Sequence, residues 1–303
     1  MFEATDVVSV NGMDPDRSRE TPPLAALPTE PPARPVGLRS AAVPSPALDL
    51  TDALAPLAFG QRGLLVAPDA RRASAALSVL ASAIAAANPA AKVLLVRPAA
   101  APAPDRDADG PDAVCLLRTE LEDGADRHVR LLSDAADMAR RGAELGRDVV
   151  VLLEGLTTTL GESAAALGLA VPRRAEEGAL PTLRRLFASA RAVRGGGSVT
   201  VIATAVAPTG RCPALDQLRA GALELFEPLA DWFVRLAPDG AACPIDAASA
   251  RSEAAARLRP DDAGALRAAL ADPETAPAAL KSFFKRLPPP PALEAVPTFQ
   301  APV

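Results

Sequence analysis

Short apolar runs alternate with longer segments of mixed polarity over most of the chain. The runs are four to seven residues long and fall at Gly63–Val66, Lys92–Val96, Ala113–Leu117, Asp148–Leu153, Ser198–Thr204 and Asp231–Leu236. Runs of this length without strict alternation are typical of strands that are buried on both faces. They predict a buried, mostly parallel sheet.

The segments between these runs have helical periodicity. Helices are predicted at 72–87, 126–145 and 180–193. In the first of them, Leu77, Leu80 and Ile84 fall on one face. Helices that connect buried parallel strands cover both faces of the sheet, so the pattern predicts an α/β fold. From Ala247 to Arg286 the pattern becomes helical, which predicts a helical carboxyl-terminal cap.

Proline-rich stretches flank and interrupt this pattern. Residues 1–47 are polar and hold nine prolines between Pro15 and Pro46, and residues 288–303 begin with four consecutive prolines. Such stretches bury too little apolar surface to offset the entropy lost on ordering. We therefore expect a disordered arm over 1–47, a folded domain over 48–287 and a tail over 288–303. A loop is predicted from Pro98 to Pro111.

Charge and composition narrow the classes of function. The net charge is −5, whereas a strong nucleic-acid binder would carry a basic surface. Three dispersed cysteines without a C-x-x-C pair, and His128 as the one histidine, favour neither a zinc site nor a disulfide framework. The start of the chain lacks the pattern of a signal peptide, and no apolar run approaches the ~18 residues of a membrane span. We expect a cytoplasmic protein that binds no metal.

A loop follows the first apolar run and leads into the first predicted helix, where α/β folds place a phosphate-binding loop. Such a loop needs glycines so that backbone N–H groups can approach the phosphates. It also needs a lysine for the phosphate charge and a Ser or Thr hydroxyl for Mg²⁺. From Ala67 to Ser74 the chain has Ala-Pro-Asp-Ala-Arg-Arg-Ala-Ser. The hydroxyl is present, but the glycines and the lysine are not.

Eight short segments, in order along the chain, resemble the ATPase domain of transcription termination factor Rho. They are Leu48–Leu50, Gly60–Pro68, Asp126–Val129, Gly146–Leu153, Arg185–Arg191, Gly195–Ala205, Thr209-Gly210 and Pro244–Asp246. The resemblance covers roughly residues 48–286 and implies a RecA-like fold, a mostly parallel sheet flanked by helices. For the family it also implies ATP and Mg²⁺ as cofactors, RNA as a ligand and hexameric rings.

The positions that contact the nucleotide in this family are altered here. Arg72–Ser74 is Arg-Ala-Ser where the family has Gly-Lys-Thr, and Glu154 stands where the Walker B aspartate ends its strand. Arg71 and Arg72, beside a predicted helix start, are either a non-catalytic anion site or two solvated arginines. Glu154 is either a longer substitute for the metal-holding aspartate or a remnant. The degenerate nucleotide site would comprise Pro68, Asp69, Arg71, Arg72, Ala73, Ser74 and Glu154.

Residues for turnover and for RNA contact are altered as well. After Arg97-Pro98 the family's catalytic glutamates are replaced by Ala99 and Ala100, and the segment 237–243 lacks the family's arginine finger. An RNA interface would depend on a few arginines without neighbouring aromatics, and a solvated helix face is the alternative interpretation. The arginines are Arg173, Arg174, Arg184 and Arg219.

These observations predict a degenerate Rho-like protein, a pseudo-ATPase without catalytic residues that acts by binding a protein, or weakly RNA or a nucleotide. We expect no resident cofactor and no segment that resembles the family's amino-terminal oligonucleotide-binding barrel. The expected partner is a Rho-type ring subunit, another transcription component or a second copy of the chain. No membrane partner is expected.

The alternative is an active Rho-type ATP-dependent RNA helicase with an atypical nucleotide site. It would need a lysine supplied from elsewhere, and Lys92 is the candidate nearest the sheet. Because Lys92 begins a strand, it should lie at the edge opposite the nucleotide. The remaining titratable residue of interest, His128, is expected to have a structural role at a helix start.

Overall fold

The computed structural model describes Val8 and residues 15–100, 114–120, 122–157, 159, 180–258, 263–272 and 274–290. The loop predicted from Pro98 to Pro111 lies largely outside these residues. The strand before it continues to Ala100, past the predicted end at Val96. No helix in the described part of the chain is both long enough and apolar enough to cross a membrane.

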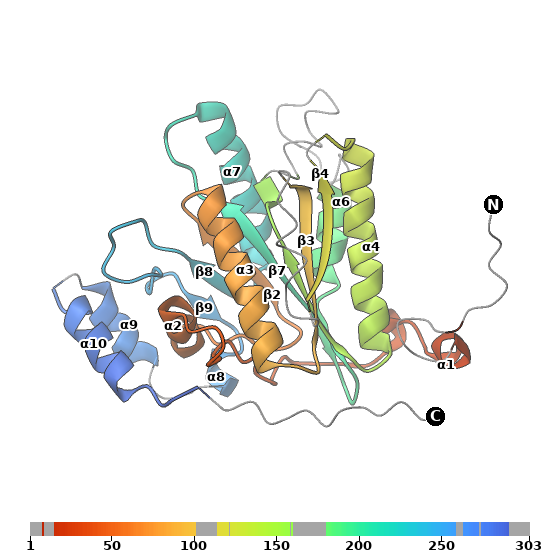
Figure 1. The fold of residues 1–303 in the computed structure, drawn as a ribbon, viewed down its shortest axis with the longest axis horizontal. Helices are drawn as coiled ribbons and strands as arrows, with labels where there is room; N and C mark the ends of the chain where they lie inside the picture. The colour runs from red at the N-terminus through yellow and green to blue at the C-terminus, as the bar shows by residue number, and fades with distance from the viewer. Residues whose placement is uncertain are drawn as a thin grey trace.

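A mostly parallel sheet lies at the centre of the described structure (Figure 1). Its strand order is β4-β3-β5-β7-β2-β8-β9, and β6 joins β7 while β1 joins β6. The strands from β4 to β8 along this path are parallel, whereas β9, β6 and β1 pair antiparallel. The strands are β1 (Thr29–Glu30), β2 (Arg62–Ala67), β3 (Lys92–Ala100), β4 (Val114–Glu120), β5 (Asp148–Leu153), β6 (Arg191–Val193), β7 (Ser198–Val206), β8 (Trp232–Arg235) and β9 (Arg251–Ser252).

Helices cover both faces of this sheet, as the apolar pattern predicts (Figure 1). α2, α3, α9 and α10 share one core layer with the sheet, and α4, α6 and α7 share the other. The helices are α1 (Pro15–Glu20), α2 (Pro46–Leu54), α3 (Ala70–Ala87), α4 (Ala125–Glu144), α6 (Leu180–Ala188), α7 (Pro213–Phe226), α8 (Ala255–Leu258), α9 (Ala263–Ala271) and α10 (Ala276–Arg286), with short 3₁₀ helices η1 (Leu24–Ala26) and η3 (Glu227–Leu229).

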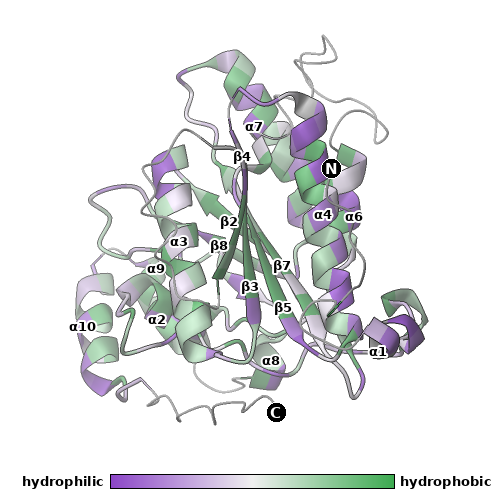
Figure 2. Cartoon of the chain, turned by 45° about the vertical axis from the view of Figure 1, so that its right-hand side comes forward, coloured by the Kyte–Doolittle hydropathy of each residue, from purple (hydrophilic) through white to green (hydrophobic). Residues whose placement is uncertain are grey.

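Alternate residues of each central strand enter opposite layers of the core. In β2, Leu64 and Val66 pack in the layer of α4, α6 and α7, whereas Leu65 packs in the layer of α3. Figure 2 shows the central strands as predominantly hydrophobic and α4 as a mixture of hydrophobic and hydrophilic residues. Burial on both faces is the physical reason why the strands appear in the sequence as uninterrupted apolar runs.

The predicted fold class is confirmed, and so is the helical carboxyl-terminal cap. The helix predicted over 180–193 is wrong in its last part, because it ends at Ala188 and Arg191–Val193 forms β6 instead. β6 turns back onto β7, so the pairing of its backbone with the sheet overrides the helical periodicity. Helix α7 was not predicted. It begins with Pro213 at its first position, where a proline is well tolerated.

The disordered arm expected over residues 1–47 is a wrong prediction for residues 24–45. Leu24, Val36 and Leu38 are at most 3% exposed. Strand β1 adds to β6, and the Val36 N–H donates to Leu57 O at 2.8 Å. Proline restricts the unfolded chain as well as the folded one, so a proline-rich segment loses less entropy when it becomes ordered. A few apolar anchors are then enough to hold it.

Arg34 fastens this arm to the start of β5. Its guanidinium donates two hydrogen bonds to the Asp148 carboxylate, one of them at 2.8 Å from Nη1 to Oδ2. This hydrogen bonding raises the pKa of Arg34 above its ordinary value. Asp148 Oδ1 also accepts from Ser198 Oγ at 2.7 Å, so one carboxylate joins the arm, β5 and β7.

Replacing Leu38 by Ala tests whether the arm is part of the core. The change should lower the free energy of unfolding by about 2–5 kcal/mol, since Leu38 is 1% exposed and a cavity would remain. Urea denaturation followed by tryptophan fluorescence measures it. Leu229→Ala, at a leucine that is 37% exposed, is the matched control and should cost less than about 1 kcal/mol. Equal effects of the two substitutions would show that the arm does not pack as described.

Candidate nucleotide site at the carboxyl edge of the sheet

The carboxyl edge of the sheet gathers residues that the sequence indicates as a nucleotide site. Parallel strands end at one edge, and ligands of open α/β sheets bind there. Ala67 ends β2, Arg97 lies near the carboxyl end of β3, and Glu154 directly follows β5. Because β3 and β5 are neighbours, Arg97 and Glu154 are close together. Ser74 approaches them from the first turns of α3.

Asp69 caps α3 in the loop after β2. Its backbone is extended, and its carboxylate accepts the Arg72 N–H at 2.9 Å. A helix amino terminus attracts an anion because its first N–H groups lack helical partners and its dipole end is positive. Here the anion is a side chain of the protein. Ala73, at the family's lysine position, is 3% exposed and supplies no charge.

Ser74, Glu154 and Arg97 form one hydrogen-bonded network beside this loop. Ser74 Oγ donates to Glu154 Oε2 at 3.2 Å, and Arg97 Nε donates to the same oxygen at 2.8 Å. Arg97 Nη2 also donates to Ser78 Oγ at 2.6 Å, one turn further along α3. The side chains of Arg97 and Glu154 are 11% and 26% exposed. The ion pair is therefore largely shielded from solvent.

The main chain fixes the position of Glu154. Its N–H donates to Val96 O in β3 at 2.9 Å. The next residue, Gly155, has a φ of 77°, in the left-handed region that glycine adopts readily. The Gly155 N–H donates to Thr204 Oγ1 in β7 at 2.9 Å. The turn after β5 is thus held from the strands on both sides, which leaves the carboxylate little freedom to move away from Arg97.

This arrangement does not fit a Mg²⁺-nucleotide. Carboxylate and hydroxyl oxygens are suitable magnesium ligands, and Glu154 and Ser74 provide both. The Glu154 oxygen, however, is already neutralised by the Arg97 guanidinium. Phosphates in the loop would meet the Asp69 carboxylate without a lysine to balance their charge. Among the described residues there is also no cluster of three or more His, Cys, Asp or Glu side chains that could hold a metal.

Comparison with known proteins identifies the sequence family. No protein-family model matches the chain. The transcription termination factors Rho of Streptomyces coelicolor and Streptosporangium roseum are 34% and 36% identical to it over 213 and 218 residues, or 68% of this chain in both cases. The Rho protein of Bacillus subtilis is 29% identical over 67% of the chain. The chain is a homologue of Rho. It spans about half the length of these curated relatives, 50%, 53% and 48% respectively.

Solved structures place the fold among ATPases. An ATPase from the type III secretion system of pathogenic bacteria matches 83% of this chain and 71% of its own, with a TM-score of 0.57 and 17% identity. The ATP synthase subunit NeqB from Nanoarcheaum equitans matches 82% of this chain and 63% of its own, with a TM-score of 0.61 and 17% identity. At such identities the likeness concerns the fold alone. It agrees with the RecA-like architecture that the resemblance to Rho implies.

The two loop arginines of this Rho homologue differ in their surroundings. Arg71 is exposed at the start of α3. Arg72 is only 29% exposed, and its Nη1 atom lies 3.0 Å from Oδ1 of Asp239 on the turn after β8. The structure thus separates two neighbouring arginines that look equivalent in the sequence, and Arg72 faces the body of the protein.

The arginines considered for RNA contact are not brought together as a group. Arg173 and Arg174 lie outside the described residues. Arg184 is exposed on α6. The Arg219 Nη1 donates to Asp216 at 3.1 Å and to Thr209 Oγ1 at 3.3 Å, and its side chain is 15% exposed. Arg219 therefore has an anionic partner within the protein.

Two other residues singled out in the sequence have structural positions. His128 is 3% exposed near the start of α4, and its Nδ1 lies 2.7 Å from Thr119 Oγ1 in β4. Lys92 is the first residue of β3, at the amino-terminal edge of the sheet. As predicted from strand direction, Lys92 is on the far side of the sheet from Glu154 and cannot replace the missing loop lysine.

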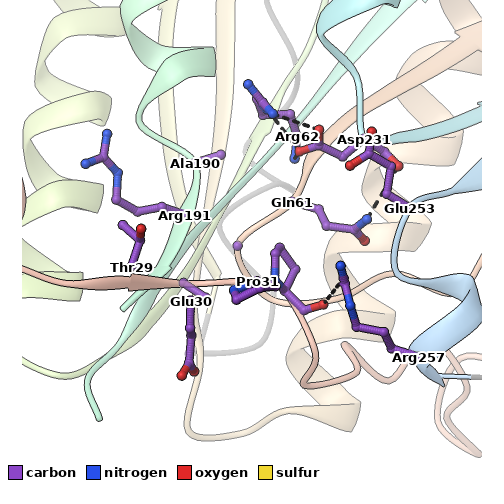
Figure 3. Close-up of a pocket in the computed structure, with 13 residues that line it drawn as sticks. Thr29, Glu30, Pro31, Gln61, Arg62, Ala190, Arg191, Asp231, Glu253 and Arg257 are labelled. Atoms are coloured by element: carbon purple, nitrogen blue, oxygen red, sulfur yellow. Dashed lines mark hydrogen bonds and ion pairs between the residues drawn. The ribbon is translucent and has the colours of Figure 1, made fainter. Parts of the chain in front are cut away.

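A polar pocket of about 420 Å³ opens at this opposite, amino-terminal edge (Figure 3). Arg62, the first residue of β2, donates to Asp231 from its backbone at 3.1 Å and from Nε and Nη2 at 2.9 and 2.7 Å. This bonding raises the pKa of the Arg62 guanidinium. Arg257 Nη1 donates to Pro32 O at 3.0 Å. Arg62 and Asp231 thus neutralise each other where β2 begins, and Arg257 joins the pocket to the proline-rich arm.

Sequence reasoning missed the role of Arg97. In the sequence, Arg97-Pro98 only marks the positions where Ala99 and Ala100 replace the family's catalytic glutamates, and no role is predicted for Arg97 itself. The signal that could have identified it was the position of Arg97 near the end of β3, because β3 lies beside β5, the strand that precedes Glu154. That adjacency depends on strand order, which the sequence pattern does not specify.

A double-mutant cycle on Arg97 and Glu154 tests the ion pair. Arg97→Met and Glu154→Gln should each destabilise the protein, and the coupling free energy should be about 1–3 kcal/mol because the pair is shielded. Urea denaturation of the four proteins measures it. The control cycle uses Arg127→Met and Asp123→Asn, a pair whose arginine is 70% exposed, with an expected coupling below about 1 kcal/mol. A coupling at Arg97 no larger than the control would contradict the network.

The ionised Asp216 carboxylate should stabilise the folded protein near neutral pH, and this stabilisation should be lost in acid. The Thr209 N–H, with further hydrogen bonds from Arg219 and the Gly210 and Cys212 backbones, holds the pKa of Asp216 below its ordinary value of 3.8. The unfolded chain therefore binds this proton first as the pH falls. The contribution is complete above about pH 4 and is lost as the pH falls through the lowered folded value.

Thermal unfolding between about pH 5 and pH 2 measures this effect. The Asp216→Asn protein should show a shallower fall of the midpoint with decreasing pH than the unmodified protein, because the titrating carboxylate is gone. Asp137→Asn, on an exposed part of α4, serves as the control. If Asp216→Asn leaves the slope unchanged, the hydrogen bonds at Thr209 do not favour the ionised carboxylate.

Proposed function

We propose that this chain is a Rho-like pseudo-ATPase, a protein that keeps the ATPase fold of its relatives but does not hydrolyse ATP, and that it acts by binding another protein. The observation that carries the proposal is the network of Arg97, Glu154 and Ser74. The two oxygens suited to hold a magnesium ion are already bound within the protein.

The chemistry of phosphoryl transfer supports this proposal. The reaction depends on positioning and on cations that neutralise charge developing on the phosphate, and an arginine finger alone is worth about 10³–10⁵ in rate. Ala73 takes the place of the loop lysine, and Asp69 adds a negative charge where phosphate would lie. These differences all weaken the neutralisation of charge during phosphoryl transfer, so their effects on the rate of ATP hydrolysis combine.

The features that the chain retains favour a protein as its partner. Buried apolar side chains fill the core on both faces of the sheet in the described residues. The fold can therefore hold a protein-binding surface in place without ATP hydrolysis. The chain is similar in sequence to Rho proteins over 68% of its length, which favours a Rho-type ring subunit as the partner. The net charge of −5 and the internal pairing of Arg219 argue against RNA as the main ligand.

ATP hydrolysis by the purified chain, measured with and without RNA, tests the proposal. The rate should equal that of the Glu154→Gln protein under both conditions, because neither protein can assemble the catalytic charges. Mixing the chain with a full-length Rho protein and measuring particle mass should reveal a complex. RNA-stimulated hydrolysis that is lost in Glu154→Gln would instead establish an active enzyme. A chain that stays monomeric alone and with Rho would contradict the proposed mode of action.

A further inference from the structure

A second pocket, of about 620 Å³, lies in the helical carboxyl-terminal cap, where α2, α9 and α10 meet. These helices lie side by side at one end of the molecule (Figure 1). Because α9 ends at Ala271 and α10 begins at Ala276, the connection is short and the two helices run antiparallel. The volume falls within the range of about 300–1,000 Å³ that is typical of small-molecule sites.

Small side chains on facing helices create this space. On α9, Ala263, Leu266 and Ala269 line the pocket at intervals of three residues, which puts them on one face of the helix. On α10, Ala279 and Phe283 line it one turn apart. An alanine side chain ends at Cβ, so it leaves space that a larger residue would fill. The lining extends over nearly two turns of each helix, and the pocket is therefore elongated.

The walls of the pocket are fixed by the rest of the fold. The Phe283 ring packs edge-to-face against Phe284, with ring centroids 5.1 Å apart, and both residues pack against the core layer that contains α3. Helix α9 is fastened to α2 by Arg267, whose Nη2 donates to Leu54 O at 3.0 Å. A pocket that is already formed needs little further ordering when a ligand binds.

The carboxyl end of α10 adds positive charge to this apolar lining. Arg286 lines the pocket, and its Nε donates to Ser282 O in the same helix at 3.3 Å. In the part of the chain that the structure describes, neither Arg286 nor the exposed Lys281 and Lys285 forms an ion pair. No Asp or Glu is among the described residues that line the pocket. Two of the chain's three lysines therefore lie on one helix without an anionic partner, although the net charge is −5.

The helix dipole explains only part of this arrangement. Basic residues in the last turn of a helix are favourable by themselves, because they lie at the negative end of the dipole. This effect accounts for Lys285 and Arg286. It does not account for Lys281 one turn earlier, or for an elongated apolar space beside the charges. An apolar chain with an anionic end would match both features.

From this combination we propose that the pocket binds a fatty acid, an unbranched aliphatic chain that ends in a carboxylate, as a free molecule from solution. The carboxylate pairs with the Arg286 guanidinium, whose donors match the two carboxylate oxygens. The chain lies between α9 and α10 among Leu266, Ala279 and Phe283. An uncharged ligand would leave Arg286 unpaired, and a cationic one would be repelled by it and by the neighbouring lysines. The inference is independent of the proposed function, because Arg97, Glu154 and Ser74 do not line this pocket.

Isothermal titration calorimetry of the full chain with dodecanoate, below the concentration at which it forms micelles, tests the site. We expect saturable binding with a dissociation constant on the order of 10 μM. Decanoate, two methylenes shorter, should bind about ten times more weakly, because both methylenes would be buried. Dodecyltrimethylammonium has the same chain length with a cationic end and should also bind at least about ten times more weakly.

Two neighbouring alanines on α10 provide a matched control. Ala279→Leu should weaken dodecanoate binding by more than about tenfold, because leucine fills the space and is compatible with a helix. Ala278→Leu should leave binding unchanged, since Ala278 is exposed and does not line the pocket. Ser282→Leu, at an exposed lining position, tests the same point if Ala279→Leu does not fold. Arg286→Met should weaken binding by about five- to tenfold, whereas Arg184→Met, at an exposed arginine on α6, should not. Circular dichroism establishes that each variant is folded.

The outcomes separate this proposal from the proposed function. Absence of saturable binding, or an equal loss in Ala279→Leu and Ala278→Leu, overturns the fatty-acid site and leaves the pseudo-ATPase proposal standing. Equal affinity for dodecanoate and dodecyltrimethylammonium also overturns it. So does binding to vesicles of phosphatidylcholine and phosphatidylglycerol without binding of free dodecanoate, because α10 would then act as a helix on a membrane surface. ATP hydrolysis by the chain would contradict only the proposed function.

Discussion

The constraint on which this structure depends is that its central strands are buried on both faces. A strand covered on both sides must carry apolar residues at successive positions, as Val149–Leu153 does in β5. Its polar backbone must then be paired by neighbouring strands, and parallel neighbours require crossover helices that supply the two layers of cover. One requirement thus accounts for the apolar runs, the helices between them and the two core layers.

The same arrangement creates the chemistry of the carboxyl edge. Parallel strands end together, so residues near the ends of β3 and β5 meet even though 57 positions separate Arg97 from Glu154 in the chain. A carboxylate at such an edge is largely shielded and needs a cation or hydrogen-bond donors. In this chain Arg97 and Ser74 supply both. The site therefore satisfies its own charges, and an added cation would have to displace a guanidinium that the fold holds in place.

The sequence predicts the parts of this picture that depend on local pattern. Strands β2, β3, β4, β5, β7 and β8, helices α3 and α4 and the altered loop from Ala67 to Ser74 follow from periodicity and residue type. What it does not predict are pairings between distant segments. The burial of Val36 and Leu38 depends on apolar side chains from later parts of the chain. Strand β6 was mistaken for helix because its pairing with β7 is nonlocal. The contact of Arg97 with Glu154 likewise requires the order of strands in the sheet.

The loop at the start of α3 is stabilised by the protein's own side chains. A helix amino terminus without a bound phosphate leaves several N–H groups unpaired. A capping aspartate satisfies one of them and is typically worth about 1 kcal/mol. Asp69 accepts this bond from Arg72 N, so the carboxylate that would repel phosphate also stabilises the helix in its absence. Arg97 acts in the same direction by neutralising Glu154 without a metal. Both side chains favour a protein that is stable by itself, whereas a phosphate-binding loop holds donors unpaired until the nucleotide arrives. That is the balance expected of the proposed pseudo-ATPase, whose stability would not be limited by the needs of catalysis.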